Sequence, residues 1–187
     1  MPAAKQVIAI EIDDCKISEL TADTGASPTY ATAIDVPNIV SMQVQPQLRS
    51  ATLEGDAVVD SVYSKVTHAT GSIQFRSVPM DVLGVMLGAS VTQSGTTPNQ
   101  TTVLAIGENA KGKFFKLQGR AVNVEGIDAT AAAGLKAVVY KAKLTGTPQI
   151  TFNEGFADLT AEYTAVRTRS DRKLFDITVE ETQTVIS

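Results

Sequence analysis

The residues that could carry chemistry in this chain are few and lie far apart in the sequence. His68 is the only histidine and Cys15 the only cysteine, so a Ser-His or Cys-His catalytic pair would have to use one of them. His68 stands inside Val66–Thr70, whose alternation of residue types predicts a strand. Cys15 lacks the flanking residues of a reactive thiol. We interpret both as structural strand residues, and we do not expect an enzyme.

The glycine-rich segment Gly107–Lys113 matches most of the phosphate-binding loop motif. In that motif backbone amides hold phosphates, and a serine or threonine after the lysine holds magnesium. Phe114 occupies the serine position, and Phe114–Val124 reads as a strand where the motif needs the start of a helix. We therefore predict a hairpin turn here and no nucleotide or other cofactor.

Two pairs of adjacent carboxylates, Asp13-Asp14 and Glu180-Glu181, are the remaining candidates for catalysis or metal binding. Neighbouring side chains on a strand point to opposite faces of the sheet. Neither pair can then share a metal ion or act as acid and base on one substrate. We interpret both pairs as solvated residues and predict no metal site.

One basic cluster stands near the end of the chain: Arg167, Arg169, Arg172 and Lys173. It reads as a solvated hairpin tip, with the first two arginines on one strand face. A second interpretation is a contact between identical chains, in which Arg167 and Arg169 meet acids of a neighbour, because complementary patches set the register between copies. The acids considered for this contact are Glu54, Asp56 and Asp60. Direct DNA binding by so few charges is the weakest of the three interpretations.

Composition excludes several classes of protein. The chain has 187 residues and a net charge of −4, which is enough for one good core and does not suit a nucleic-acid binder. Tryptophan is absent and aromatic residues make up 5%, which disfavours a carbohydrate- or receptor-binding module. A single cysteine suits a reducing compartment. The first twelve residues do not resemble a signal peptide, and no stretch reaches the length of a membrane span. We expect synthesis in the cytoplasm and no insertion into a membrane.

A period of two dominates the sequence and predicts an antiparallel, mainly β fold, as a sandwich or barrel, over a single domain of residues 1–187. The predicted strands are Lys5–Ile12, Ile39–Val44, Ala57–Tyr63, Val66–Phe75, Phe114–Val124, Leu135–Leu144, Leu159–Thr168 and Leu174–Val179. Polar stretches at residues 21–32 and 90–102 read as long loops, which on rigid β-scaffolds often make contacts.

One short helix is predicted over residues 79–88. Proline stands where the helix would begin, an acid follows in its first turn, and Gly88 would end it. Its apolar residues include Val82, Leu83, Met86 and Leu87, which cover most of its circumference and indicate burial on more than one side. Either the helix closes one end of the β structure, or its second face packs on a neighbouring subunit.

Much of the chain, from about Asn38 onward, resembles the major tail tube proteins of long-tailed, non-contractile (siphovirus-type) bacteriophages. The resemblance is carried by segments spread along the sequence: Val36–Pro37 through Leu53–Asp56, Ser64–Val66, Val78–Gly88, Phe114–Arg120, Val139–Gly146, Phe152–Ala157 and Leu174–Ile177. None of these segments is a catalytic signature.

The resemblance implies a virion structural protein: six copies form a ring, rings stack into a tail tube, and genomic DNA passes through the lumen at ejection without specific binding. It also implies contacts with the tape measure protein and with the tail terminator and tip proteins. Many family members carry an extra C-terminal immunoglobulin-like domain, which we do not expect here. The segment from Gln47 to Asp56, with Arg49 inside it, is polar and reads as turn-rich, so it could reach the next ring. The runner-up is the tube protein of a contractile tail or secretion device.

Overall fold

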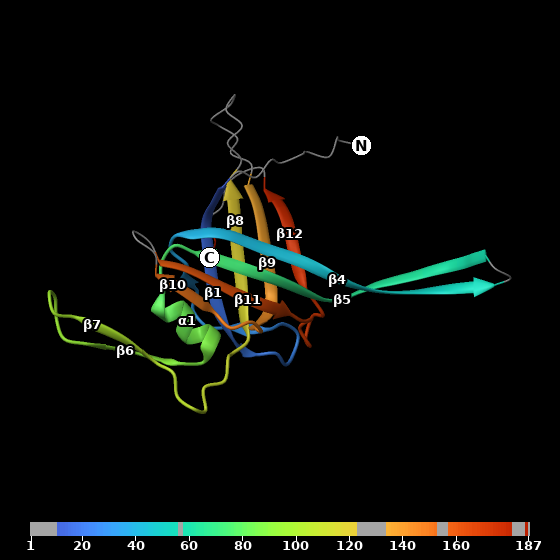
Figure 1. Ribbon diagram of the computed structural model, residues 1–187. Coiled ribbons are helices and arrows are strands. Elements are labelled where there is room, and N and C mark those ends of the chain that lie inside the picture. The colour runs from blue at the N-terminus through green and yellow to red at the C-terminus, as the bar shows by residue number, and fades with distance from the viewer. Residues whose placement is uncertain (1–10, 56–57, 123–133, 153–156, 181–185, 187) are drawn as a thin grey trace, which may run out of the picture.

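The fold is mainly β and antiparallel with one short helix, as the sequence predicts. A computed structural model describes residues 11–55, 58–122, 134–152, 157–180 and 186 (Figure 1). Within them the helix is α1 (Met80–Leu87). The strands are β1 (Glu11–Ala22), β2 (Thr29–Tyr30), β3 (Ile34–Asp35), β4 (Ile39–Gly55), β5 (Val58–Phe75), β6 (Ser90–Ser94), β7 (Thr101–Ala105), β8 (Phe115–Val122), β9 (Gly134–Leu144), β10 (Gln149–Phe152), β11 (Ala157–Ala165) and β12 (Phe175–Glu180).

The main sheet has the strand order β2-β1-β8-β9-β11-β5-β4, and it divides at β9. The first half of β9 pairs with β12, whereas its last residues, Ala142–Leu144, pair with β11. Figure 1 shows β4, β5, β10 and β11 crossing over β1, β8, β9 and β12. The two groups of strands thus form two layers with apolar side chains between them; a full sandwich or barrel closure remains a prediction.

The core follows the period of two that the sequence shows. In β11 the alternate residues Leu159, Ala161 and Tyr163 are buried, as expected for a strand with one face on a core. The Tyr163 ring meets Phe115 of β8 edge to face, with the ring centroids 6.4 Å apart, which joins the two layers. A side chain at Gly71 would lie 2.5 Å from the Tyr163 ring, so this strand position needs glycine.

Helix α1 begins and ends where the sequence predicts. Pro79 is its N-cap residue, and Gly88 ends it with φ of 66°, a left-handed conformation that glycine adopts without strain. A Cβ atom at Gly88 would also lie 2.0 Å from the Lys111 carbonyl oxygen. The helix residues Val82, Leu83 and Met86 are buried in the main core, and Leu87 is half-buried against it.

Two hairpins extend away from the layers on opposite sides of the molecule (Figure 1). One is formed by β4 and β5, which are 17 and 18 residues long. The other is formed by β6 and β7 next to α1. We call the outer part of the β4–β5 hairpin, residues 48–66, the arm.

The hairpins correct two predictions about polar segments. Residues 90–102 are not one long loop. β6 pairs with β7 in a hairpin whose register runs from Ser90–Ala105 to Ser94–Thr101, and only residues 95–100 connect the two strands. The segment from Gln47 to Gly55 is continuous strand rather than turn-rich. The 90–102 segment is rich in threonine and serine, and Gln47–Gly55 contains Ser50 and Thr52; these residue types tolerate a pleated strand that water covers on both sides. The stretch 21–32 is also partly strand, since β1 continues to Ala22 and β2 occupies Thr29–Tyr30.

Three local interpretations are also wrong. Asp13 is not simply solvated, because the Arg120 guanidinium donates to both of its carboxylate oxygens, at 3.1 and 2.7 Å. The Gly107–Lys113 segment contains a turn but joins β7 to β8, which lie in different sheets, so it is not a hairpin turn. Arg167 and Arg169 follow the end of β11 instead of sharing one of its faces.

Candidate functional site: the arm and its root

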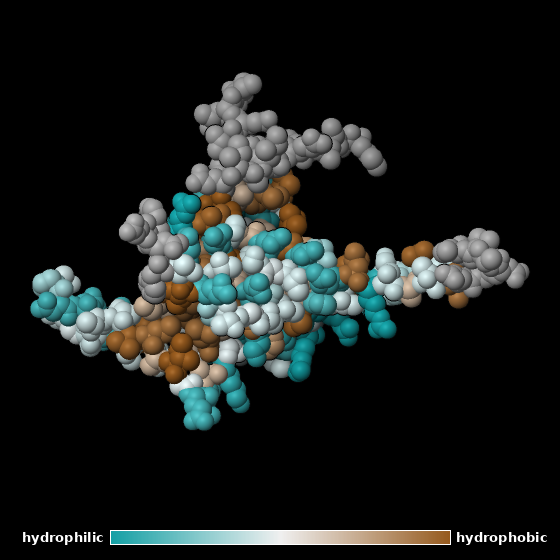
Figure 2. Space-filling view, viewed as in Figure 1, coloured by the Kyte–Doolittle hydropathy of each residue, from teal (hydrophilic) through white to brown (hydrophobic). Residues whose placement is uncertain are grey.

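The arm exposes large apolar side chains that no core covers. Exposed fractions are 65% for Leu48, 62% for Leu53, 65% for Val62 and 63% for Tyr63. Figure 2 shows hydrophobic residues along the projecting arm among polar ones. Single exposed apolar residues are ordinary on protein surfaces, but a group of them on one projecting element marks an interaction surface.

The register of β4 and β5 gives the arm two different faces, because directly opposed residues point to the same side. Over residues 48–52 and 62–66 one face carries no charge: Leu48 opposes Val66, Ser50 opposes Ser64, and Thr52 opposes Val62. On the other face Arg49 opposes Lys65 and Ala51 opposes Tyr63. The arm therefore presents an apolar and hydroxyl surface on one side and a cationic, aromatic surface on the other.

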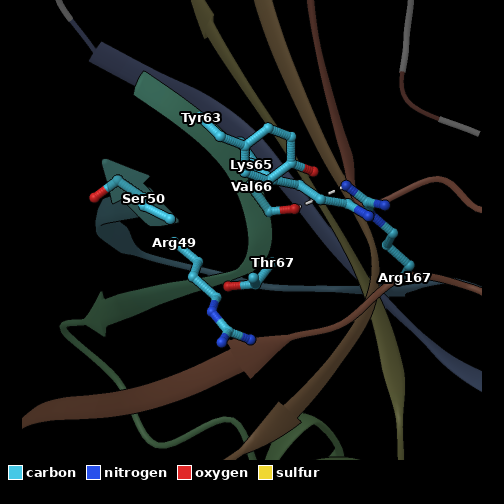
Figure 3. A pocket seen from close by; sticks show the side chains of 8 residues that line it. Arg49, Ser50, Tyr63, Lys65, Val66, Thr67 and Arg167 are labelled. Atoms are coloured by element: carbon cyan, nitrogen blue, oxygen red, sulfur yellow. Dashed lines mark hydrogen bonds between the residues drawn. The ribbon is translucent and has the colours of Figure 1, made fainter. Parts of the chain in front are cut away.

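A cavity of about 550 Å³ lies at the root of the arm, where the hairpin leaves the layers. We call it the notch; its charged lining residues are Arg49, Lys65 and Arg167, and Tyr63 also lines it (Figure 3). Arg167 enters from the segment after β11, and its Nη2 donates to the Val66 carbonyl oxygen at 2.8 Å. Residues a hundred positions apart in the sequence thus line one cavity.

The cations of the notch have no counterion in the described part of the chain. No carboxylate lines the cavity, and the ion pairs of the described residues do not include Arg49, Lys65 or Arg167. Like charges directly opposite each other on paired strands are destabilising. The notch therefore favours an anion that comes from outside the described part of the chain.

A largely buried carboxylate, that of Asp23, holds the segment that carries Arg167. Asp23 lies 2.5 Å from the Lys141 ammonium, and each side chain is 10% exposed. The same carboxylate accepts hydrogen bonds from the backbone amides of Arg169, at 2.9 and 3.0 Å, and of Ser170, at 3.3 Å. Burial alone would raise the pKa of Asp23, but the bonds from Lys141 and the two amides, with the lysine charge, lower it to about 2. Asp23 thus fixes the chain just after Arg167.

The other predicted contact residues lie elsewhere. Gln47 is half-buried at the root, where its amide donates to Thr70 Oγ1 at 2.9 Å. Arg169 does not line the notch. Glu54 and Asp60 belong to β4 and β5 in the outer part of the arm, although the placement of their side chains is not described, and Asp56 lies outside the described residues.

Sequence reasoning missed Lys65 and Tyr63 as members of this site. Their positions relative to Arg49 follow from the hairpin register, in which Arg49 opposes Lys65. Had the two predicted strands Ala57–Tyr63 and Val66–Phe75 been joined into one long strand, the alternation would have placed Tyr63 and Lys65 on a common face.

The remaining candidates for chemistry do not form a reactive site. Cys15 is buried, and burial, followed by the charge of Asp14, raises the pKa of its thiol to about 12. His68 is half-buried, and its Nδ1 lies 2.9 Å from Thr67 Oγ1. Among the described residues no group of histidine, cysteine or acidic side chains could hold a metal ion. The described part of the chain contains no helix that is long and apolar enough to span a membrane.

A larger hollow, of about 1030 Å³, lies between β1, β8 and the start of β4. Its charged residues include Asp13 and Arg120, which neutralise each other. Unlike the notch, this hollow has an internal counterion for the arginine that is buried in it.

The sequence matches no protein-family model, and no curated protein matches it significantly. Function is therefore inferred from the arm and the notch.

Proposed function

We propose that this protein is a structural subunit that assembles with copies of itself, as six-membered rings stacked into the tail tube of a non-contractile bacteriophage. The observation that supports this most directly is the arm, which extends beyond the core and exposes Leu48, Leu53, Val62 and Tyr63. Burying one such side chain fully is worth about 1.5–3 kcal/mol, so contact with another chain would stabilise an assembly considerably.

The outer edge of β4 supports the same proposal. β4 stands at the end of the strand order, and within the described residues its only partner is β5. A long unpaired edge invites pairing with another chain. Pro46, within β4, removes one backbone donor and limits uncontrolled pairing. Because β4 is long but lacks a backbone donor at Pro46, its edge suits pairing with another chain in one defined register.

In such a tube the protein would have defined neighbours. Its main partner is itself, and the tape measure, terminator and tip proteins of the tail would contact the ends or the lumen of the tube. Genomic DNA would pass through without specific binding, because a net charge of −4 per subunit repels phosphates. The protein would be made in the host cytoplasm and would end in the virion.

The proposal is tested by negative-stain electron microscopy of concentrated protein, with and without seeds from sheared phage tails, beside light scattering of fresh protein. We expect hollow rings or tubes. A matched pair of variants locates the contact: Leu48→Ser with Val62→Thr on the arm should reduce assembly, whereas the exposed Ile177→Thr on β12 serves as a control away from the arm. Monomers at every concentration, with seeds present, would refute the proposal.

A further inference from the structure

The segment that forms most of α1 and the whole β6–β7 hairpin carries no charge. No charged residue occurs from Val82 to Gly107, although charged residues make up 19% of the chain. The hairpin projects from the molecule, and Val103 and Ile106 are 54% and 62% exposed. Projecting strands that stay in water usually carry charges, which prevent pairing with other chains, whereas the centre of an interface is depleted of charge. The hairpin therefore has the composition of a contact surface.

The register of β6 and β7 gives this hairpin two faces. Val91 opposes Leu104, and this face packs on α1, because a Cβ atom at Gly84 would lie 2.9 Å from Val91 and 4.0 Å from Leu104. The opposite face is exposed along its whole length. We call it the β6–β7 face; in it Ser90 opposes Ala105, Thr92 opposes Val103, and Ser94 opposes Thr101.

The uncharged face of the arm matches the β6–β7 face in size and chemistry. It covers residues 48–52 and 62–66, and the β6–β7 face covers residues 90–94 and 101–105. Each face is two strands wide and five residues long, which is about 17 Å, and each is made of hydroxyl and apolar side chains. Two such strand faces can pack on each other as the layers of a β-sandwich do.

The charged groups beside the two faces are opposite in sign. Arg49 and Lys65 lie on the reverse side of the arm, and the described ion pairs do not include them. At the other hairpin the exposed acids Asp81 and Glu108 stand at the two ends of the uncharged segment. Lys113, the second lysine after Glu108, already has an ion-pair partner. Complementary charges of this kind orient two surfaces as they meet.

We propose that the uncharged face of the arm of one copy packs on the β6–β7 face of a second copy, with Leu48 and Val62 of one copy against Val103 of the other. This inference rests on the proposed self-assembly and names the contact that drives it. The two hairpins extend on opposite sides of the molecule (Figure 1), so one copy cannot join its own faces. The contact is head-to-tail and repeats from copy to copy, closing a ring or continuing a stack.

The first test crosslinks two single-cysteine variants of the full chain, Val62→Cys on the arm and Val103→Cys on the β6–β7 face. The native Cys15 is buried and does not react in the folded protein. An equimolar mixture treated with a short bismaleimide should yield a covalent dimer on a denaturing gel, whereas each variant alone should yield almost none. The chain that carries both substitutions should yield a ladder of covalent oligomers.

The matched control replaces the second position by Ile177→Cys on β12, which is 60% exposed and lies outside both hairpins. Its mixture with Val62→Cys should not crosslink. A mixture of Val62→Cys and Val103→Cys that crosslinks no better than this control would overturn the inference. Strong crosslinking of either variant alone would overturn it too, since like hairpins would then meet.

The second test places a charge on the contact. Val103→Lys puts an unpaired ammonium group into the proposed interface, where burial without a partner is costly. Its self-association, measured by sedimentation velocity, should fall roughly tenfold or more below that of the wild type. Ile177→Lys makes the same change in net charge off the contact and should associate like the wild type. Circular dichroism checks that both are folded, and equal association of the two variants would refute the contact.

These experiments separate the inference from the proposed function. If the wild type forms tubes but the Val62→Cys and Val103→Cys mixture does not crosslink, the contact is wrong and the tube proposal stands. Covalent ladders from protein that never forms rings or tubes would support the contact and refute the tube. Wild-type protein that stays monomeric at every concentration, with tail seeds present, would refute both.

Discussion

Removing the Asp23 carboxylate should destabilise the protein strongly, since this one side chain joins three parts of the chain. It follows the end of β1, pairs with Lys141 of β9, and accepts from the amides of Arg169 and Ser170 after β11. In Asp23→Ala the Lys141 ammonium stays buried without its carboxylate. Two backbone amides also lose their acceptor.

The expected loss of unfolding free energy is about 3–5 kcal/mol, the usual cost of removing one member of a buried ion pair. Asp23→Asn keeps an oxygen acceptor for the amides and should lose less. The double variant Asp23→Ala with Lys141→Met also removes the unpaired ammonium charge of Lys141, so it should be more stable than Asp23→Ala alone. Urea denaturation followed by circular dichroism measures all three against the wild type.

The pH dependence gives an independent check. Because the folded pKa of Asp23, about 2, lies below the ordinary value of 3.8, the charged carboxylate contributes its full stability above about pH 4 and loses it as the pH falls toward 2. The stability difference between the wild type and Asp23→Ala should therefore shrink over that interval. If Asp23→Ala lowered the unfolding free energy by less than about 1 kcal/mol at neutral pH, the structural role given to Asp23 would be refuted. A stability difference from the wild type that is constant from pH 5 to 2 would refute it as well.

Three further predictions concern the core and α1. Leu83→Ala should lower the unfolding free energy by about 2–5 kcal/mol in urea denaturation, because the side chain is 1% exposed; a change near zero would remove the helix from the core. Gly88→Ala should cost more than about 1 kcal/mol on the same assay, since its positive φ and the nearby carbonyl leave no room for a Cβ, and unchanged stability would contradict that geometry. Cys15 should resist a thiol reagent at neutral pH until the protein unfolds, because it is buried and its pKa is raised to about 12; fast labelling of folded protein would argue against this placement.

Elements with a strong local signal were predictable from the sequence. The alternation over Leu159–Thr168 predicts a strand, and the structure forms β11 there with the alternate residues Leu159, Ala161 and Tyr163 buried. The helix was predicted from Pro79 and Gly88, whose backbone preferences act within one or two residues. Such signals are local and are not altered by the rest of the chain.

The two projecting hairpins were harder to predict, because no core lies beneath them. A strand covered by water on both faces does not need alternating apolar residues, and its threonine- and serine-rich sequence resembles a loop. The long β4 strand was therefore predicted only as Ile39–Val44, and the β6–β7 hairpin as a polar loop over residues 90–102. What distinguishes them is the pairing of one strand with the other, a non-local property.

In the candidate site, too, single residues were predictable from the sequence, whereas their arrangement in space was not. Arg49 and Arg167 were named from the sequence as contact residues, but their convergence with Lys65 required the hairpin register and the placement of the segment after β11. Glu54 and Asp60 were named as acids of the same contact; they belong to β4 and β5, and the placement of their side chains is not described.

By itself the sequence determined the mainly β class, the position of the one helix and the scarcity of groups for catalysis, because periodicity, capping residues and composition act locally or can be counted. Only the tertiary structure decided that the arm leaves the core, that Arg49, Lys65 and Arg167 line one cavity at its root, and that Asp23 holds the segment just after Arg167. These features depend on contacts between residues many positions apart, whose register is set by the packing of the whole chain.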